Sequence, residues 1–181
     1  MKKRVLLILA DGFEEIEAVA VADVLRRLDV EVCLAGLNEL TVRGAHDMKI
    51  TADALLTEVD AALFDAVYLP GGLPGATNLL ESELTGRILK ETAARGGIVS
   101  AICAAPIVLA KHGLLDGRIF TMYPGFEAYL NGLVPTGKPA EHNGNVITGK
   151  GPGAVFDFAA QLAAALGVDT AALYDGMFVR I

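Results

Sequence analysis

A single cysteine stands among small residues in the stretch AICAAP, residues 101–106. Cys103 follows an apolar run and precedes Pro106, which suits the first turn of a helix because it has no N–H group to leave unpaired. Alanine lies two positions before and two positions after the cysteine, where a sharp strand-to-helix turn requires small side chains. A thiol at such a turn faces free backbone N–H groups, so we expect a depressed pKa and a reactive thiolate. The alternative, an inert cysteine packed in the core, fits the spacing equally well.

Glu17 is the second candidate for chemistry, because it lies on an apolar face of the helix predicted over residues 11–28. Positions 17, 21, 24 and 28 recur at helical spacing and read Glu, Val, Val and Leu. A carboxylate among apolar side chains is costly unless it is paired or protonated. The alternative is that Glu17 reaches water from the edge of this face. Glu14 and Glu15 have a simpler explanation, because acidic residues in a first turn complement the helix dipole.

A pair of glycines follows an apolar run in the stretch LPGGLPG, residues 69–75. The backbone at Gly71 and Gly72 can approach a ligand closely, and its N–H groups can stabilise an oxyanion. The alternative is an ordinary turn, which Pro-Gly-Gly already explains. The stretch GKGPG at 149–153 lacks the pattern of a phosphate-binding loop, so we interpret it as a loop before a helix.

Alternating strands and helices must position these groups. Apolar runs predict buried strands over 5–10, 30–36 and 98–103, and the stretch 65–72 predicts another strand that ends in a glycine turn. Helices are predicted over 11–28, 82–97 and 104–115, a small hairpin over 40–53, and a strand, turn and helix over 145–167. Asp11 and Glu14 resemble a capping box for the first helix. This order predicts an α/β fold with a mostly parallel sheet covered by helices on both faces, and a site beyond the carboxyl ends of the strands.

Length and composition limit the classes of function. The 181 residues predict a single domain spanning 1–181. The net charge of −7 disfavours nucleic acid and anionic membranes as partners, and no apolar run approaches the ~20 residues of a membrane span. Cys33 and Cys103 offer neither a disulfide framework nor zinc-ligand spacing. The apolar run after MKKR lacks a cleavage region, so we expect a cytoplasmic protein.

Four stretches occur together in an order that resembles the DJ-1/ThiJ/PfpI superfamily, and its DJ-1 branch in particular: DGFEEIEAV, LPGG…GATNL, AICAAP and GKGPG…FDFA. The resemblance covers almost the whole chain. It implies a flavodoxin-like three-layer α/β sandwich related to class I glutamine amidotransferases, usually a homodimer. It further implies that Cys103 is an oxidation-prone nucleophile and Glu17 a protonated carboxyl that hydrogen-bonds it. The N–H groups of Gly72 and Ala104 would form the oxyanion pocket.

Several positions depart from the patterns of this superfamily. Ala104 stands where the protease-like branch has a histidine, which argues against a peptidase or an amidotransferase triad. Tyr123, in TMYP, stands where the DJ-1 branch often has a histidine, and a phenol is a poor base at neutral pH. His46 stands where the family can carry an arginine near the anion site of the dimer, and Arg27 matches another basic position there. We expect structural or surface roles for Cys33 in the core and for His112 and His142 at the surface.

The resemblance implies a thiol-dependent, stress-protective protein that uses no cofactor and no metal. In the first hypothesis, the protein has glyoxalase III or deglycase-like activity on a small carbonyl compound such as methylglyoxal. Cys103 adds to the α-oxoaldehyde, backbone N–H groups hold the oxyanion, Glu17 transfers protons and a hydroxy acid such as lactate leaves. In the second, Cys103 is oxidised to a sulfinate in a sensor or redox-regulated chaperone. The name ThiJ is also associated with thiamine (thiazole monophosphate) biosynthesis, for which these residues provide no phosphate site.

Overall fold

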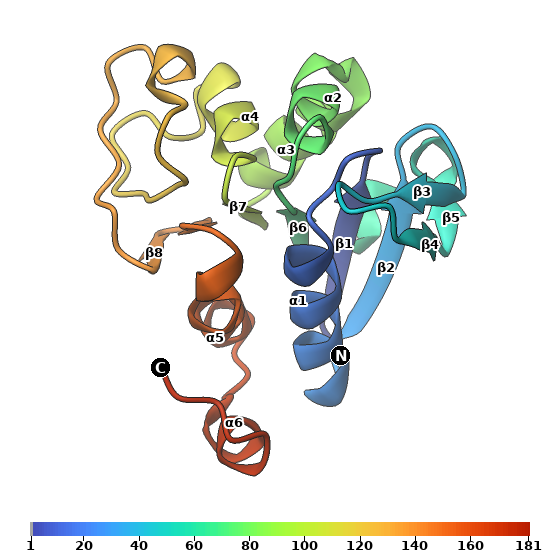
Figure 1. The fold of residues 1–181 in the computed structure, drawn as a ribbon, viewed down its shortest axis with the longest axis vertical. Coiled ribbons are helices and arrows are strands. Elements are labelled where there is room, and N and C mark those ends of the chain that lie inside the picture. The colour runs from blue at the N-terminus through green and yellow to red at the C-terminus, as the bar shows by residue number, and fades with distance from the viewer. Residues whose placement is uncertain (1) are drawn as a thin grey trace.

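A computed structural model describes residues 2–181 as a central sheet with helices on both faces (Figure 1). The sheet has the strand order β5-β2-β1-β6-β7-β9-β8. Its strands are β1 (Arg4–Leu9), β2 (Glu31–Gly36), β5 (Ala54–Leu55), β6 (Ala66–Leu69), β7 (Ile98–Ile102), β8 (Ala140–Asn143) and β9 (Val146–Gly149). Every neighbouring pair is parallel except β8 with β9, which confirms the predicted mostly parallel sheet.

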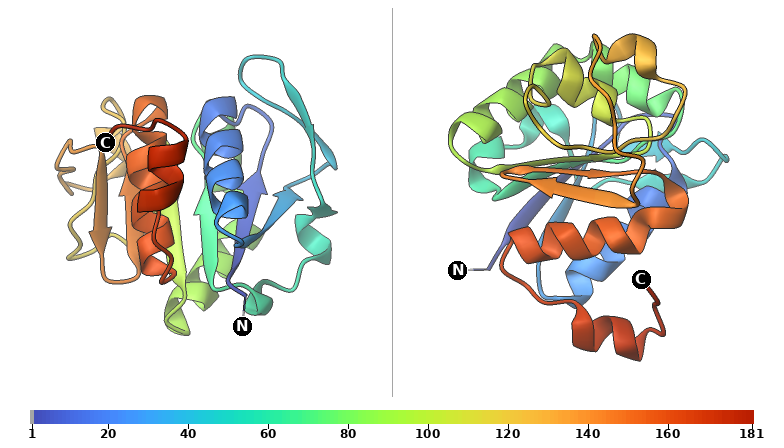
Figure 2. Two further views of the ribbon diagram at one scale, coloured as in Figure 1. Left: turned by 90° about the horizontal axis from the view of Figure 1, so that it is seen from below. Right: turned by 90° about the vertical axis from the view of Figure 1, so that its left-hand side faces the viewer.

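Helices form the two outer layers, as Figure 2 shows. One face of the sheet is covered by α1 (Glu15–Arg27) and α5 (Val155–Ala165), with α6 (Ala171–Gly176) packed beyond them. The other face is covered by α2 (Gly75–Glu81), α3 (Glu83–Ala94) and α4 (Pro106–Lys111). Short 3-10 turns complete the chain at η1 (Leu56–Glu58), η2 (Ala61–Leu63), η3 (Glu127–Tyr129) and η4 (Pro152–Ala154). The predicted three-layer α/β fold is therefore confirmed.

Strand β1 shows why a continuous apolar run is required at the centre of this sheet. Val5, Leu7 and Leu9 pack in the core layer beneath α1 and α5. Leu6 and Ile8 point to the opposite face and pack in the layer beneath α2, α3 and α4. Because successive side chains of a strand point to opposite faces, both faces can be buried only if every residue is apolar.

Several predicted boundaries are wrong, and the reasons are local. The capping box does not form, because the Asp11 carboxylate accepts the backbone N–H of Arg43 and α1 begins only at Glu15. The helix predicted over 104–115 is limited to α4. Strand β6, in contrast, ends at Leu69 and is followed by the glycine turn, as predicted. Helices α2 and α6 and strand β8 were not predicted, because they are short and lie in stretches rich in turn residues.

The predicted hairpin over 40–53 is confirmed as the antiparallel pair of β3 (Thr41–Arg43) and β4 (Lys49–Thr51). Its connecting loop, residues 44–48, packs on the start of α1, where the backbone N–H of Ala45 donates to the carbonyl of Phe13. A Cβ atom at Gly44 would overlap the side chain of Glu15, so glycine is required for this approach. Within residues 2–181, no helix combines the length and the apolar character that crossing a membrane requires.

Candidate functional site

The three segments singled out in the sequence follow three neighbouring parallel strands. β1, β6 and β7 are adjacent in the sheet, so the segments that follow them meet at one edge. Glu17 lies on α1 after β1, the glycine pair follows β6, and Cys103 follows β7. A Cβ atom at Gly71 would lie 2.6 Å from the Cβ of Cys103 and 2.8 Å from Oε2 of Glu17. The bare backbone of Gly71 is therefore what allows these two side chains to lie together.

The backbone at Cys103 has an unusual conformation that fixes the direction of the thiol. Its φ of +63° lies in the left-handed region, which residues other than glycine rarely adopt. Two hydrogen bonds hold it there: Cys103 N–H donates to the carbonyl of Gly149, and Tyr123 N–H donates to the carbonyl of Cys103, both at 2.9 Å. Ala101 and Ala105 are fully buried on either side, which explains the small residues at these offsets. Pro106 begins α4, as predicted.

Glu17 is completely buried, so the alternative that it reaches water from the edge of the helix is wrong. Its Oε2 accepts the backbone N–H of Gly71 at 2.7 Å. Its Oε1 has no nitrogen or oxygen partner of good geometry among residues 2–181, and the thiol of Cys103 is the polar group beside the carboxyl. A buried, charged carboxyl oxygen without a hydrogen-bond partner costs free energy. Transfer of the thiol proton to this oxygen would remove that charge, so the arrangement favours proton exchange between Glu17 and the sulfur.

Burial and mutual repulsion determine the protonation of this pair. Burial raises the pKa of Glu17 to about 7, with the Gly71 N–H and the thiol opposing and the charge of Glu14 adding to the rise. Burial and the Glu17 carboxylate raise the pKa of the Cys103 thiol to about 12. The predicted depression of the thiol pKa is therefore wrong, because burial and a neighbouring anion outweigh the backbone N–H groups. A carboxyl group with a pKa near 7 can both accept and return a proton at neutral pH.

Two backbone N–H groups converge on the sulfur. Those of Gly72 and Ala104 hydrogen-bond the thiol and act against the rise in its pKa. Gly72 has a φ of +87°, and a Cβ atom there would come within 2.4 Å of the Glu14 nitrogen. Only glycine fits this close approach. An ordinary turn, the alternative interpretation of this stretch, would not require such close backbone contact. The same two N–H groups can stabilise negative charge that develops beside the sulfur.

Tyr68 belongs to the site, although nothing in the sequence singled it out. It lies on β6 with its ring fully buried against Phe158, at 5.0 Å between the ring centres. Its hydroxyl donates to the backbone carbonyl of Glu17 at 3.0 Å, so it positions the helix turn that carries the carboxyl. An aromatic residue in an apolar strand looks like core, and its sequence context carries no signal of this hydrogen bond.

Tyr123 adjoins the cysteine through its backbone, while its ring lies over the neighbouring loop. The ring packs on Gly151, where a Cβ atom would lie 3.2 Å from it. It lines a groove of about 420 Å³ together with Pro124, Pro152 and Asp157. The side chain is 47% exposed, so a phenol at this position faces solvent rather than the buried Glu17.

Glu15 lies in the first turn of α1, as its interpretation as a complement to the helix dipole requires, but that interpretation is incomplete. Its carboxylate is buried, its Oε1 accepts the backbone N–H of His46 at 2.7 Å, and its Oε2 lies 2.8 Å from Nδ1 of His46. Burial acts to raise the pKa of Glu15, but these hydrogen bonds outweigh it and lower the value. The same contact raises the pKa of His46. Arg27, the other position compared with the anion site, pairs with Asp23 on the exposed surface of α1.

The remaining candidates lie away from the cysteine. His112 lies at the end of α4, half-buried against Gly86, and its pKa is lowered by burial and nearby lysines, so the prediction of a surface position is correct only in part. His142 is exposed, as predicted. Cys33 packs against the core from β2 but is only partly buried, so the prediction of a core position is correct only in part.

Comparisons with known proteins agree with this geometry. Residues 3–165 match the model of the DJ-1/PfpI family. The chain is 43% identical to protein dj-1beta of Drosophila melanogaster over 166 residues, which cover 90% of this chain and 89% of that protein. It is 34% identical to the glutathione-independent glyoxalase DJR-1.2 of Caenorhabditis elegans, covering 89% and 87%. A crystal structure of a DJ-1 superfamily protein from Salmonella typhimurium superposes with a TM-score of 0.92 and 37% identity, covering 99% and 100%. The chain therefore belongs to the DJ-1/PfpI family.

Proposed function

We propose that this protein converts a small α-oxoaldehyde, such as methylglyoxal, to the corresponding α-hydroxy acid without glutathione or another cofactor. The observation that carries the proposal is the buried Glu17 carboxyl, with a pKa of about 7, beside the thiol of Cys103. The reaction requires a nucleophile and a group that both removes and returns protons near neutral pH. The relative from Caenorhabditis elegans that is named a glutathione-independent glyoxalase supports the choice of substrate.

The first half of the reaction forms a bond between the sulfur and the substrate. Glu17 accepts the thiol proton while the sulfur attacks the aldehyde carbon, so the high pKa of the free thiol does not prevent attack. The aldehyde oxygen becomes an oxyanion, held by the N–H groups of Gly72 and Ala104. Glu17 then returns the proton to this oxygen, which yields a neutral hemithioacetal and restores the carboxylate.

The second half moves a hydrogen between two carbons of the substrate. Glu17 removes the proton from the carbon bonded to Cys103, and the electron pair forms an enediolate with the adjacent carbonyl. Glu17 returns this proton to the second carbon, while the hydroxyl proton on the oxygen of the first carbon moves to the oxygen of the second, which gives a thioester and a new hydroxyl group. Water then cleaves the thioester, releasing the hydroxy acid and the free thiol. One carbon is oxidised while its neighbour is reduced, so water is the sole co-reactant.

The direct test is incubation with methylglyoxal in the absence of glutathione, following both its loss and the formation of lactate. Cys103→Ala is expected to abolish both, whereas Cys33→Ala provides a matched thiol control and retains both. Equal amounts of methylglyoxal lost and lactate formed would distinguish conversion from simple trapping of the aldehyde by thiols and amines. Loss without lactate, or turnover that survives Cys103→Ala, would exclude the proposal.

A redox-sensing role is the second candidate, and it is favoured by Oε1 of Glu17, which has no nitrogen or oxygen partner among residues 2–181. An oxidised Cys103 carrying a sulfinate would accept a hydrogen bond from the protonated carboxyl and from the backbone N–H groups already directed at the sulfur. Wild-type protein that shows no oxoaldehyde turnover, but takes up two oxygen atoms at Cys103 and none at Cys33 under dilute peroxide, would support this candidate instead.

We also propose that the protein forms a homodimer through the exposed face of α1 and the neighbouring hairpin. Ile16 and Val19 on α1 and Met48 beside β4 are each more than half exposed. Val19 and Ile50 line a shallow groove of about 370 Å³ between these two elements. Apolar patches of this kind are typical of protein interfaces. Replacement of Val19 by Asp should yield a monomer in size-exclusion chromatography with light scattering; an unchanged elution would exclude this surface.

A further inference from the structure

Glu14, Glu15 and His46 form a second cluster of ligand-type side chains, which the proposed reaction does not use. One atom from each group, two carboxylate oxygens and Nδ1 of the imidazole, lies within 4.8 Å of the other two. Nδ1 of His46 is 2.8 Å from Oε2 of Glu15 and 3.6 Å from Oε2 of Glu14. Two ligands bound to zinc at tetrahedral angles lie about 3.3 Å apart, and the two distances from Nδ1 of His46 lie on either side of this value.

The two carboxylates differ from the exposed acidic groups that are common on protein surfaces. The side chains of Glu14 and Glu15 are only 12% and 6% exposed, whereas the imidazole of His46 is 67% exposed. Within residues 2–181 no hydrogen bond reaches the Glu14 carboxylate, and its one ion-pair neighbour is the imidazole that already contacts Glu15. One histidine therefore contacts both acids, and no other basic side chain of residues 2–181 pairs with Glu14.

The surrounding backbone holds this cluster in place. Oε1 of Glu15 accepts the N–H groups of His46 and Met48, at 2.7 and 3.4 Å, which leaves Oε2 directed at the imidazole. The backbone N–H of Glu14 donates to the carbonyl of Gly71 at 2.9 Å. Because these contacts order the ligands in advance, little conformational entropy is lost when an ion binds.

We infer that Glu14, Glu15 and His46 bind a divalent first-row transition metal ion such as Zn²⁺. The imidazole nitrogen favours this class over Ca²⁺ and Mg²⁺, which prefer ligands that are all oxygen. The exposed side of His46 leaves room for water or a small chelating ligand to complete the coordination. The site is separate from the Cys103 thiol, and the inference does not depend on the proposed glyoxalase activity.

Calorimetric titration of the metal-free protein with Zn²⁺ near pH 8 tests this inference, with Co²⁺ as a spectroscopic probe. One ion should bind per chain, and the Co²⁺ complex should lack the absorption band of a cobalt–thiolate bond. Cys103→Ala should bind Zn²⁺ as wild type does. His46→Ala and Glu14→Gln should each weaken binding by about tenfold or more, because each removes a ligand.

Matched controls separate this site from adventitious binding. Asp47 lies in the same loop and, among residues 2–181, pairs with Arg43 alone. Asp47→Asn removes the same charge as Glu14→Gln but no proposed ligand, so it should leave the affinity unchanged. His142→Ala removes an exposed histidine elsewhere and should also have no effect. Binding that is lost in Cys103→Ala, binding that persists unchanged in His46→Ala, or the absence of any saturable binding would overturn the inference.

Discussion

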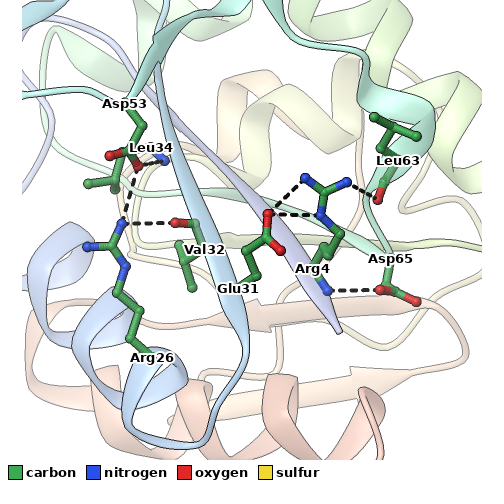
Figure 3. A network of polar contacts seen from close by, with 8 residues as sticks. All are labelled: Arg4, Arg26, Glu31, Val32, Leu34, Asp53, Leu63 and Asp65. Carbon is green, nitrogen blue, oxygen red and sulfur yellow. Dashed lines mark hydrogen bonds and ion pairs between the residues drawn. The ribbon is translucent and has the colours of Figure 1, made fainter. Parts of the chain in front are cut away.

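The two cysteines of this protein differ in the charged groups around them: those near Cys33 are exposed and paired, whereas the one beside Cys103 is buried. Cys33, on β2, is surrounded by a network of ion pairs near the surface, in which Arg26 pairs with Asp53 and Arg4 pairs with Glu31 (Figure 3). Cys103 has a single carboxyl group, Glu17, completely buried beside it.

Burial rather than the number of charges makes one of these regions suited to chemistry. The Arg26–Asp53 pair is about half exposed, so water and opposite charges compensate each side chain and its contribution is small. Glu17 is fully buried and forms no ion pair with the described residues 2–181, so its protonation responds strongly to its surroundings. The pKa of both thiols is raised by burial, but only at Cys103 does a group with a pKa near 7 stand ready to accept the proton.

The largest expected effect is on turnover. Glu17→Gln keeps the size of the side chain but removes the proton acceptor, so oxoaldehyde conversion should fall by about 10²-fold or more. Asp53→Asn, which removes a carboxylate near the other cysteine, should change turnover by less than about twofold because that pair is exposed. Initial rates of lactate formation check both variants. Turnover that survives Glu17→Gln, or that falls equally in both variants, would show that the buried carboxyl beside Cys103 is no more important for catalysis than the exposed one near Cys33.

The same pair of variants should differ in stability. The folded pKa of Glu17 is raised from an ordinary value of 4.5 to about 7, so its contribution to stability is lost as pH rises through that range. The shift corresponds to a penalty of roughly 3 kcal/mol above pH 7, at 1.36 kcal/mol per unit. Glu17→Gln should therefore be more stable than wild type near pH 8 and nearly equal to it near pH 4.5.

Urea denaturation of wild type and both variants at these two pH values measures this effect. Asp53→Asn should change the free energy of unfolding by less than about 1 kcal/mol at either pH, because a half-exposed ion pair contributes little. A Glu17→Gln protein that is less stable than wild type near pH 8 would show that the carboxylate is compensated in a way the structure does not display.

Alkylation of the two thiols provides a smaller but more local effect. Removing the Glu17 charge lowers the pKa of Cys103, so iodoacetamide should label Cys103 faster in Glu17→Gln than in wild type near pH 8. Each unit of pKa changes the thiolate fraction tenfold, and we expect an acceleration of about tenfold. Cys33 is the internal reference and should be unaffected in peptide mass analysis. Slower labelling of Cys103 would mean that Glu17 stabilises the thiolate by donating a proton.

The smallest effect is expected at Tyr123. Its ring is half exposed over Gly151, so Tyr123→Phe should reduce turnover by less than about threefold, which is below the loss of a typical hydrogen bond. Tyr123→His adds a group titrating near ~6.5, but because the side chain at this position faces solvent rather than Glu17, it should also leave turnover nearly unchanged on either side of that pH. Abolished turnover in a folded Tyr123→Phe protein would assign the phenol an essential part in the reaction.

The sequence was sufficient to predict the layers and the candidates for chemistry. Apolar runs that bury both faces of a strand, with helical patterns between them, determine a mostly parallel sheet regardless of detail. The elbow at Cys103 and the carboxylate on the apolar face of α1 were recognisable because both break local rules of composition or burial. The short elements α2, α6 and β8 were not predicted, because so few residues cannot show the hydrophobic periodicity of a helix or a strand.

Only the tertiary structure decided how these groups act on one another. The sequence predicts a depressed pKa for Cys103 from its place near a helix start, but α4 begins three residues later and Glu17 is buried against the thiol. The hydrogen bond from Tyr68 and the contact of Glu15 with His46 join residues more than 30 positions apart. Electrostatic energies depend on distance and on the exclusion of water, and both are set by packing between segments that no local pattern records.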